Sequence, residues 1–250
     1  MNKNILLLTS TIKPISNQPQ LKLINHIDRL QDYKVALAFY SHLLEKGVVD
    51  NIVYIDNSGF DLSCHSEIYT HKDIEWLSYY GLDYPETYHR GYGESKLVDY
   101  AFEHSKTLIA LDSSDKVWRI TGRYIIKNLT TIIKFSPSKF DFYCNLRGNW
   151  VDMELLAWSK EGYKKIIQNM WNKLATGEAT ELILARSVID GRINQLKIIT
   201  TQFWPPFIVG RRGTDGGNFQ GRFTKYKFLL SQIISLILLP LRRLIYFTRS

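Results

Sequence analysis

Short polar side chains follow three apolar runs of this sequence, at residues 9–11, 56–59 and 121–123. Such runs predict buried strands, and in a parallel sheet ligands bind beyond the carboxyl ends of the strands. Hydroxyl, amide and glycine residues gathered at that edge with an arginine predict a nucleotide-binding site. The residues expected to contact the nucleotide are Thr9, Thr11, Asn57, Ser58, Thr121 and Gly122. For Asn57 and Ser58, the alternative is that they only shape the turn.

Common phosphate and metal motifs are missing from the sequence. It contains no Walker-type phosphate loop, and Gly91-Tyr92-Gly93 lacks the third glycine and the preceding strand of a dinucleotide fingerprint. The six histidines show neither HxH nor HExxH spacing. The expected site therefore has to bind its ligand through other residues.

Strand and helix patterns alternate along the chain, which predicts one α/β domain with a mainly parallel sheet flanked by helices. Short apolar runs predict strands at 4–9, 51–55, 117–121, 140–144 and 196–201. Helical spacing of apolar residues predicts helices at 28–46, 94–111 and about 160–189, the first of them capped by Asp28.

The positive charge of the chain is concentrated at its end. The whole sequence has a formal net charge of +8, whereas residues 211–250 hold eight basic residues and one acidic residue, and so carry +7. The preceding 210 residues are nearly neutral, at +1. Because a nucleic-acid-binding protein needs basic residues over its body, this distribution argues against nucleic acid as a partner.

The last thirty residues predict a membrane-associating helix. From Leu230 the apolar residues recur at three- and four-residue spacing, with basic residues on the opposite face of 227–249. The longest apolar run, 228–239, would cover about 18 Å as a helix, which is too short for a hydrocarbon core of about 30 Å. We therefore expect a globular domain at 1–220 and a C-terminal amphipathic helix within 221–250 that lies on an anionic membrane. The alternative is packing against the body or a second subunit, in a homo-oligomer.

Cysteine usage and the N-terminus predict an intracellular protein. Cys64 and Cys144 are too few for a disulfide scaffold and lack the spacing of a zinc site, so both are expected to be buried thiols. The apolar run at 5–8 is shorter than the core of a signal peptide. A reducing compartment is therefore expected.

Two segments carry a resemblance to a known family. Gly91 to Glu94, followed by a predicted helix and then Trp118 to Tyr124 with Asn128, resembles the bacterial GT-A-type glycosyltransferases that build capsule and lipopolysaccharide chains, including O-antigen. Supporting matches lie at 9–12, 29–33 and 56–59, so the resemblance spans roughly 4–220. It implies a GT-A-like, Rossmann-type fold, a nucleoside diphosphate sugar donor, most simply UDP-linked, and a lipid-linked or lipopolysaccharide glycan acceptor. The expected location is the cytoplasmic face of the bacterial inner membrane, as a peripheral protein.

The sequence departs from this family where most members hold a metal ion. Their central strand ends in paired aspartates, whereas this chain has Thr121-Gly122-Arg123. We infer that Arg123 replaces the charge of the metal against the leaving diphosphate, because a guanidinium binds phosphate oxygens in a bidentate way. The alternative is that Arg123 pairs with Asp112 or Asp115. No metal is expected, although Asp152 and Glu154 have the spacing of a metal-binding carboxylate pair.

Glycosyl transfer with inversion needs a base for the acceptor hydroxyl, usually a carboxylate. Asp152 is the first candidate and Glu181 the second, although Glu181 also suits the first turn of a helix. Glu94 either contacts hydroxyls of the donor sugar or complements a helix dipole, and Gly93 marks backbone that turns tightly or approaches the ligand. The basic loop at 210–217, with Arg211, is expected to close over the diphosphate.

A second class of function is a catalytically silent, membrane-bound scaffold of a polysaccharide assembly complex. The missing metal carboxylates keep this alternative open. Nucleotide binding and turnover separate the two classes.

Overall fold

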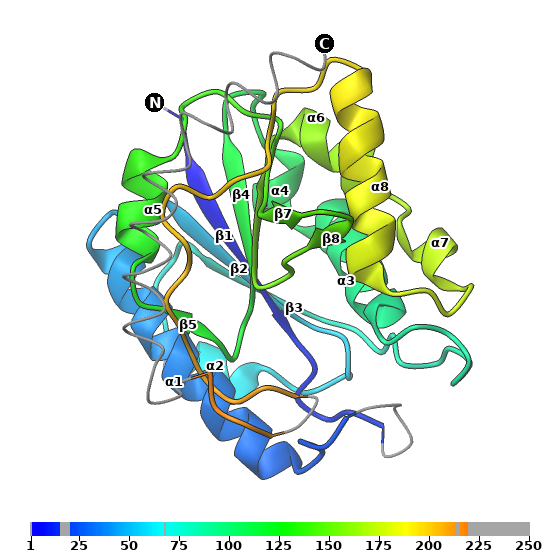
Figure 1. Cartoon of the computed structure of the whole chain (residues 1–250). Helices are drawn as coiled ribbons and strands as arrows, with labels where there is room; N and C mark the ends of the chain where they lie inside the picture. Colours follow the sequence, from blue (N-terminus) through cyan, green and yellow to red (C-terminus); the bar gives the residue numbers. More distant parts are fainter. Residues whose placement is uncertain (1, 16–20, 68, 214–215, 220–250) are drawn as a thin grey trace.

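A seven-stranded sheet forms the centre of the molecule, with helices on both faces (Figure 1). The computed structural model describes residues 2–15, 21–67, 69–213 and 216–219. Strand order is β10-β6-β9-β4-β1-β2-β3. Strand β9 runs antiparallel to its neighbours β4 and β6, and the other pairs are parallel. The predicted class, α/β with a mainly parallel sheet flanked by helices, is confirmed.

The strands of the large sheet are β1 (Asn4–Ser10), β2 (Asn51–Asp56), β3 (Ile74–Ser78), β4 (Lys116–Thr121), β6 (Phe142–Tyr143), β9 (Leu155–Trp158) and β10 (Ile198–Ile199). Two small antiparallel pairs are β5 (Ile125–Ile126) with β11 (Ile208–Val209), and β7 (Leu146–Arg147) with β8 (Trp150–Val151). The helices are α1 (His26–Glu45), α2 (Ser63–Ser66), α3 (Gly91–His104), α4 (Lys106–Ile109), α5 (Leu129–Phe135), α6 (Lys160–Gly162), a π-helical turn (Tyr163–Ile167), α7 (Trp171–Leu174) and α8 (Thr180–Ile193).

Each face of the sheet has its own apolar core. Because side chains alternate along a strand, Ile5 and Leu7 of β1 pack on the side of α3 and α8, whereas Leu6 and Leu8 pack on the side of α1. Figure 1 shows α1 and α5 on one side of the sheet and α3, α7 and α8 on the other. Burial on both faces explains why these strands are continuous apolar runs in the sequence.

Several predicted helix boundaries are wrong. Helix α1 is capped by Asn25, whose side chain accepts a hydrogen bond from the amide of Ile27 at 2.9 Å, and not by Asp28. The helix predicted at 94–111 begins at Gly91 and is interrupted at Ser105, which caps α4. The segment predicted as one helix at 160–189 is divided among α6, the π-helical turn, α7 and α8, because Asn169 and Gly177 adopt positive φ angles of 60° and 78°.

The predicted tail helix at 227–249 and the domain boundary at 220 lie outside the described residues. Among the residues that are described, no helix is long and apolar enough to cross a bilayer. The membrane expectation therefore rests on the sequence of the tail.

Glu75 of β3 links the sheet to the start of α4. Its carboxylate accepts hydrogen bonds from the Ser105 hydroxyl at 2.6 Å and from the amides of Lys106 and Thr107 at 2.7 and 3.0 Å. Burial raises the pKa of Glu75, but these hydrogen bonds outweigh it, and the net pKa lies below the usual 4.5. The ionised carboxylate therefore stabilises the fold above pH 4.5.

We predict that Glu75→Gln lowers the free energy of unfolding by about 1–2 kcal/mol at pH 7. The difference from the wild type should shrink as the pH falls below 4.5, because protonation of Glu75 removes the same stabilisation. Urea denaturation at pH 7 and pH 3.5 measures both values. Asp73→Asn, which changes a partly exposed carboxylate that pairs with His71 just before the same strand, is the control, and an equal loss in both variants would contradict the prediction.

Candidate active site

A cleft of about 390 Å³ opens at the carboxyl ends of β1, β2 and β4. Strands β1 and β4 are neighbours, with Thr9 opposite Thr121 at their ends. The chain passes from β1 to β2 and β3 on one side and returns to β4 on the other. This is the topological switch point, where ligands bind in open α/β sheets.

Seven of the predicted site residues line the cleft: Thr9, Thr11, Asn57, Glu94, Thr121, Arg123 and Glu181. The lining also includes Arg29, Tyr33, His89, Arg90, Arg119, Tyr124, Glu154, Thr180 and Arg212. The structure does not bring five predicted residues into the lining: Ser58, Gly93, Gly122, Asp152 and Arg211.

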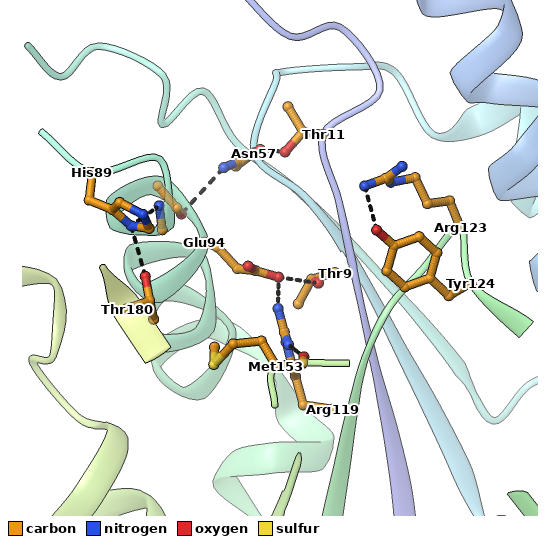
Figure 2. Close-up of polar contacts among 12 residues, drawn as sticks. Thr9, Thr11, Asn57, His89, Glu94, Arg119, Arg123, Tyr124, Met153 and Thr180 are labelled. Carbon is orange, nitrogen blue, oxygen red and sulfur yellow. Dashed lines mark hydrogen bonds and ion pairs between the residues drawn. The ribbon is translucent and has the colours of Figure 1, made fainter. Parts of the chain in front are cut away.

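A buried ion pair forms one wall of the cleft. The Arg119 side chain on β4 is 2% exposed and is paired with Glu94 of α3, which is 37% exposed. Glu94 also accepts a hydrogen bond from the Thr9 hydroxyl at 3.1 Å, and Arg119 donates to the carbonyl of Met153 (Figure 2). Burial lowers the pKa of Arg119 to about 10, so it remains a cation at neutral pH. The carboxylate of Glu94 is thus held at the cleft surface.

Two further arginines reach the cleft without a carboxylate partner among the described residues. Arg29 is 4% exposed and donates to the carbonyls of Thr11 and Leu23 at 2.7 and 3.0 Å. Arg123 donates to the carbonyl of Arg211 and to the hydroxyl of Tyr124, the latter at 2.9 Å. Neutral acceptors satisfy these hydrogen bonds but leave the positive charges uncompensated, which favours an anionic ligand.

The alternative pairing of Arg123 with Asp112 or Asp115 is wrong. Asp115 accepts from the amides of Lys3 and Asp112 at 2.9 and 3.0 Å. These contacts lie at the start of β4, whereas Arg123 follows its end. The arginine is therefore available to the cleft.

Asn57 and Ser58 have different surroundings. Asn57 accepts from the hydroxyl of Thr11 at 2.6 Å and lines the cleft beside it. Ser58 donates to the buried carboxylate of Asp56 at 2.5 Å and accepts from the amide of Lys13 at 3.0 Å. Ser58 therefore holds the turn after β2.

The predicted glycines pack against the protein itself. Gly91 and Gly93 lie in the first turn of α3, so the expected tight turn is not formed there, whereas Gly91 does line the cleft. A Cβ atom at Gly91 would lie 1.9 Å from the Thr180 hydroxyl, and one at Gly93 would lie 2.8 Å from the Tyr84 ring. Gly122 donates its amide to the carbonyl of Thr9 at 2.7 Å, and a Cβ atom at Gly122 would lie only 3.1 Å from the same oxygen, so glycine keeps the chain after β4 close to β1.

Asp152 and Arg211 are engaged away from the lining. Asp152 accepts a hydrogen bond from Asn145 at 2.7 Å and pairs with Arg147. Arg211 pairs with Asp32 of α1 at 2.9 Å, and its carbonyl accepts from Arg123. Arg211 thereby fixes the position of Arg123.

The carboxylates that line the cleft are Glu94, Glu154 and Glu181. Burial raises the pKa of Glu154, and Glu181 lies in the first turn of α8. The described residues contain no group of three or more histidine, cysteine, aspartate or glutamate side chains that could hold a metal ion. Of Asp152 and Glu154, the two carboxylates with the spacing of a metal-binding pair, only Glu154 lines the cleft.

Sequence reasoning missed Arg29, His89 and Arg119 as cleft residues. Arg119 had a readable signal, because it is the one charged residue inside the predicted strand 117–121. His89 had no such signal in the sequence, because its position at the cleft depends on the contact between the starts of α3 and α8.

Comparisons with known proteins give distant structural likenesses only. No family model matches the sequence, and no curated protein matches it significantly. Among solved structures, a "putative nucleotide-diphospho-sugar transferase" from Desulfovibrio desulfuricans G20 is 13% identical, with a TM-score of 0.47 over 82% of this chain and 84% of that one. An "inositol-1-phosphate CTP transferase" from T. maritima is 12% identical, with a TM-score of 0.47 over 93% and 96%. At these scores neither structure informs the chemistry of this cleft.

We predict that Glu94→Gln destabilises the fold by about 2–3 kcal/mol, because it leaves the buried charge of Arg119 without its partner. Glu178→Gln, which breaks the exposed pair of Glu178 with Arg186, should have a much smaller effect. Thermal and urea denaturation of the two variants at pH 7 measure the difference. Equal losses would show that the pair on the cleft wall does not carry the stability assigned to it.

Proposed function

We propose that the cleft binds a nucleoside diphosphate sugar and that the protein transfers the sugar to a glycan acceptor. The observation that supports this most strongly is the pair of arginines, Arg29 and Arg123, whose charges have no described carboxylate partner in a cleft at the switch point of the sheet. Phosphate groups are the ligands that such guanidinium groups bind best. The resemblance of residues 91–94 and 118–124 to GT-A glycosyltransferases points the same way.

The proposed orientation of the donor follows the chemistry of the two sides of the cleft. Thr11 and Asn57, at the ends of β1 and β2, offer hydroxyl and amide groups to a base or ribose, and we propose uridine. Arg123 holds the diphosphate. The carboxylate of Glu94 then faces the sugar, whose hydroxyl groups it can bind as an acceptor.

In the proposed reaction, an acceptor hydroxyl oxygen attacks the anomeric carbon while the bond from that carbon to the diphosphate oxygen breaks. Arg123 stabilises the negative charge that develops on the leaving diphosphate. Glu181 takes the proton of the hydroxyl, since of the two predicted bases it is the one that lines the cleft. We propose that this arrangement needs no divalent metal, because the guanidinium supplies the positive charge.

We predict that the purified protein binds UDP in calorimetric titrations and that Arg123→Ala weakens the binding about 10- to 100-fold, the cost of one or two charge-assisted hydrogen bonds. Arg186→Ala removes an arginine that lies on α8, outside the cleft lining, and should bind UDP like the wild type. Glu181→Gln should leave UDP binding unchanged while it slows hydrolysis of a UDP sugar.

If the wild type binds none of UDP, CDP, GDP and dTDP, the proposed function is wrong and a scaffold is favoured. If UDP binds but the protein neither transfers nor hydrolyses the sugar, the proposed reaction is wrong, and the protein is a nucleotide-binding scaffold without catalytic activity. Equal UDP affinity in the wild type and Arg123→Ala would show that Arg123 does not bind the diphosphate.

We further propose that residues 227–249 hold the enzyme on an anionic membrane, where a lipid-linked or lipopolysaccharide acceptor is at high local concentration. The support is the sequence of this segment, with its apolar stripe and basic face. A peripheral position on the cytoplasmic face of the inner membrane follows from this proposal.

We predict that the full chain sediments with vesicles of phosphatidylglycerol but not with vesicles of phosphatidylcholine. Removal of the residues after Lys225 should abolish sedimentation while UDP binding is retained. Unchanged sedimentation of the shortened chain would contradict the membrane role of the segment.

A further inference from the structure

His89 lies where the starts of α3 and α8 meet, and its ring is fixed by hydrogen bonds on one nitrogen. Nδ1 accepts from the amide of Gly91 at 3.1 Å and lies 3.0 Å from the hydroxyl of Thr180 (Figure 2). A backbone amide can only donate, so Nδ1 carries a lone pair. The proton of the neutral ring must therefore be on Nε2.

The surroundings of His89 oppose the cationic form. A proton on Nδ1 would face the amide hydrogen of Gly91, at the positive end of the α3 dipole. Burial has the largest effect and lowers the pKa of His89; Glu181 of α8 raises it, Arg90 lowers it slightly, and the net pKa lies below 6.5. The contact from α7 is uncharged: the carbonyl of Leu174 accepts a hydrogen bond from the backbone amide of His89. The imidazole is thus neutral at physiological pH.

Nε2 is the ring nitrogen left for a ligand. His89 lines the cleft, and no described residue forms a hydrogen bond with Nε2. Figure 2 shows His89 and Thr180 on one side of the view, Arg123 with Tyr124 on the other, and Glu94 between them. If Arg123 binds the diphosphate, the sugar lies toward His89 and Glu94.

We propose that His89 is a fixed, neutral hydrogen-bond donor that binds an oxygen atom of the sugar part of the donor substrate. This inference rests on the proposed function of the cleft. Glu94 can only accept hydrogen bonds when ionised, and Nε2–H of His89 can only donate, so the two side chains together distinguish the orientation of neighbouring sugar hydroxyl groups. In this tautomer His89 has no free lone pair and does not act as the base.

The state of the ring can be tested without any ligand. Long-range ¹H–¹⁵N NMR spectra of the full protein labelled at histidine, with the His89 signals assigned from their loss in His89→Asn, report the tautomer and the titration. The expected result is the neutral Nε2–H form at pH 7 and above, with a pKa below 6.5. A signal of the Nδ1–H form, or protonation with a pKa of 6.5 or above, would overturn the inference.

Two substitutions distinguish the role of Nδ1 as an acceptor from the role of Nε2 as a donor. Asparagine places an oxygen near the Nδ1 position and can still accept from Gly91, but it has no donor at the Nε2 position. Glutamine can place an amide donor near the Nε2 position, but it has no acceptor near the Nδ1 position. We expect His89→Asn to weaken binding of a UDP sugar about 3- to 10-fold, the loss of one hydrogen bond, with UDP binding and stability unchanged. His89→Gln should retain more of the affinity for the UDP sugar while losing stability, because the start of α3 is uncapped.

His104→Asn, at the exposed end of the same helix, is the control and should change neither affinity. If the wild type binds UDP and the UDP sugar but His89→Asn weakens neither, or weakens both equally, the proposed role of His89 is wrong while that of the cleft stands. If the wild type binds no nucleotide, the proposed function fails instead, and the role of His89 fails with it even where the NMR result agrees.

Discussion

The buried charge of Arg119 is the constraint on which the arrangement of the cleft depends. A guanidinium on a central strand, with its side chain 2% exposed, needs a nearby negative charge, because the free energy of transferring it from water is otherwise too unfavourable. Glu94 supplies that charge from the first turn of α3, which places the start of this helix against the ends of β1 and β4. Gly91 then lets α3 meet Thr180 at the start of α8 without a steric clash. The ion pair between β4 and α3, together with the contact between α3 and α8, forms one wall of the cleft.

The two sides of the cleft differ in how their charges are compensated. On the side of α3, the charge of Arg119 is paired with Glu94, and the cleft lining also includes His89, Arg90 and Thr180. On the side of α1, the guanidinium groups of Arg29 and Arg123 donate to carbonyl and hydroxyl oxygens and keep their net charge. A ligand with a negatively charged part and a hydroxyl-rich part matches this division. A nucleoside diphosphate sugar is such a ligand.

The sheet was largely predictable from the sequence, whereas half of the site was not. Strands β1, β2 and β4 are apolar because both of their faces are covered, and their polar ends mark the cleft at Thr9, Asn57 and Thr121. Strands β3 and β9 were not predicted, and in β3 the apolar residues are interrupted by Glu75. Asp152 looked suitable as a base by residue type, but its position outside the lining depends on Asn145 and Arg147 in the small hairpin of β7 and β8. Contacts of this kind between separate segments are not encoded in local spacing.

In the proposed complex, guanidinium groups and not a metal ion neutralise the diphosphate of the donor. A crystal structure of the protein soaked with UDP in the presence of manganese tests it directly. We expect diphosphate oxygens about 3 Å from the guanidinium nitrogens of Arg123, with the uridine beside Thr11 and Asn57. A diphosphate bound through manganese held by Asp152 and Glu154, with Arg123 still bonded only to Arg211 and Tyr124, would contradict it.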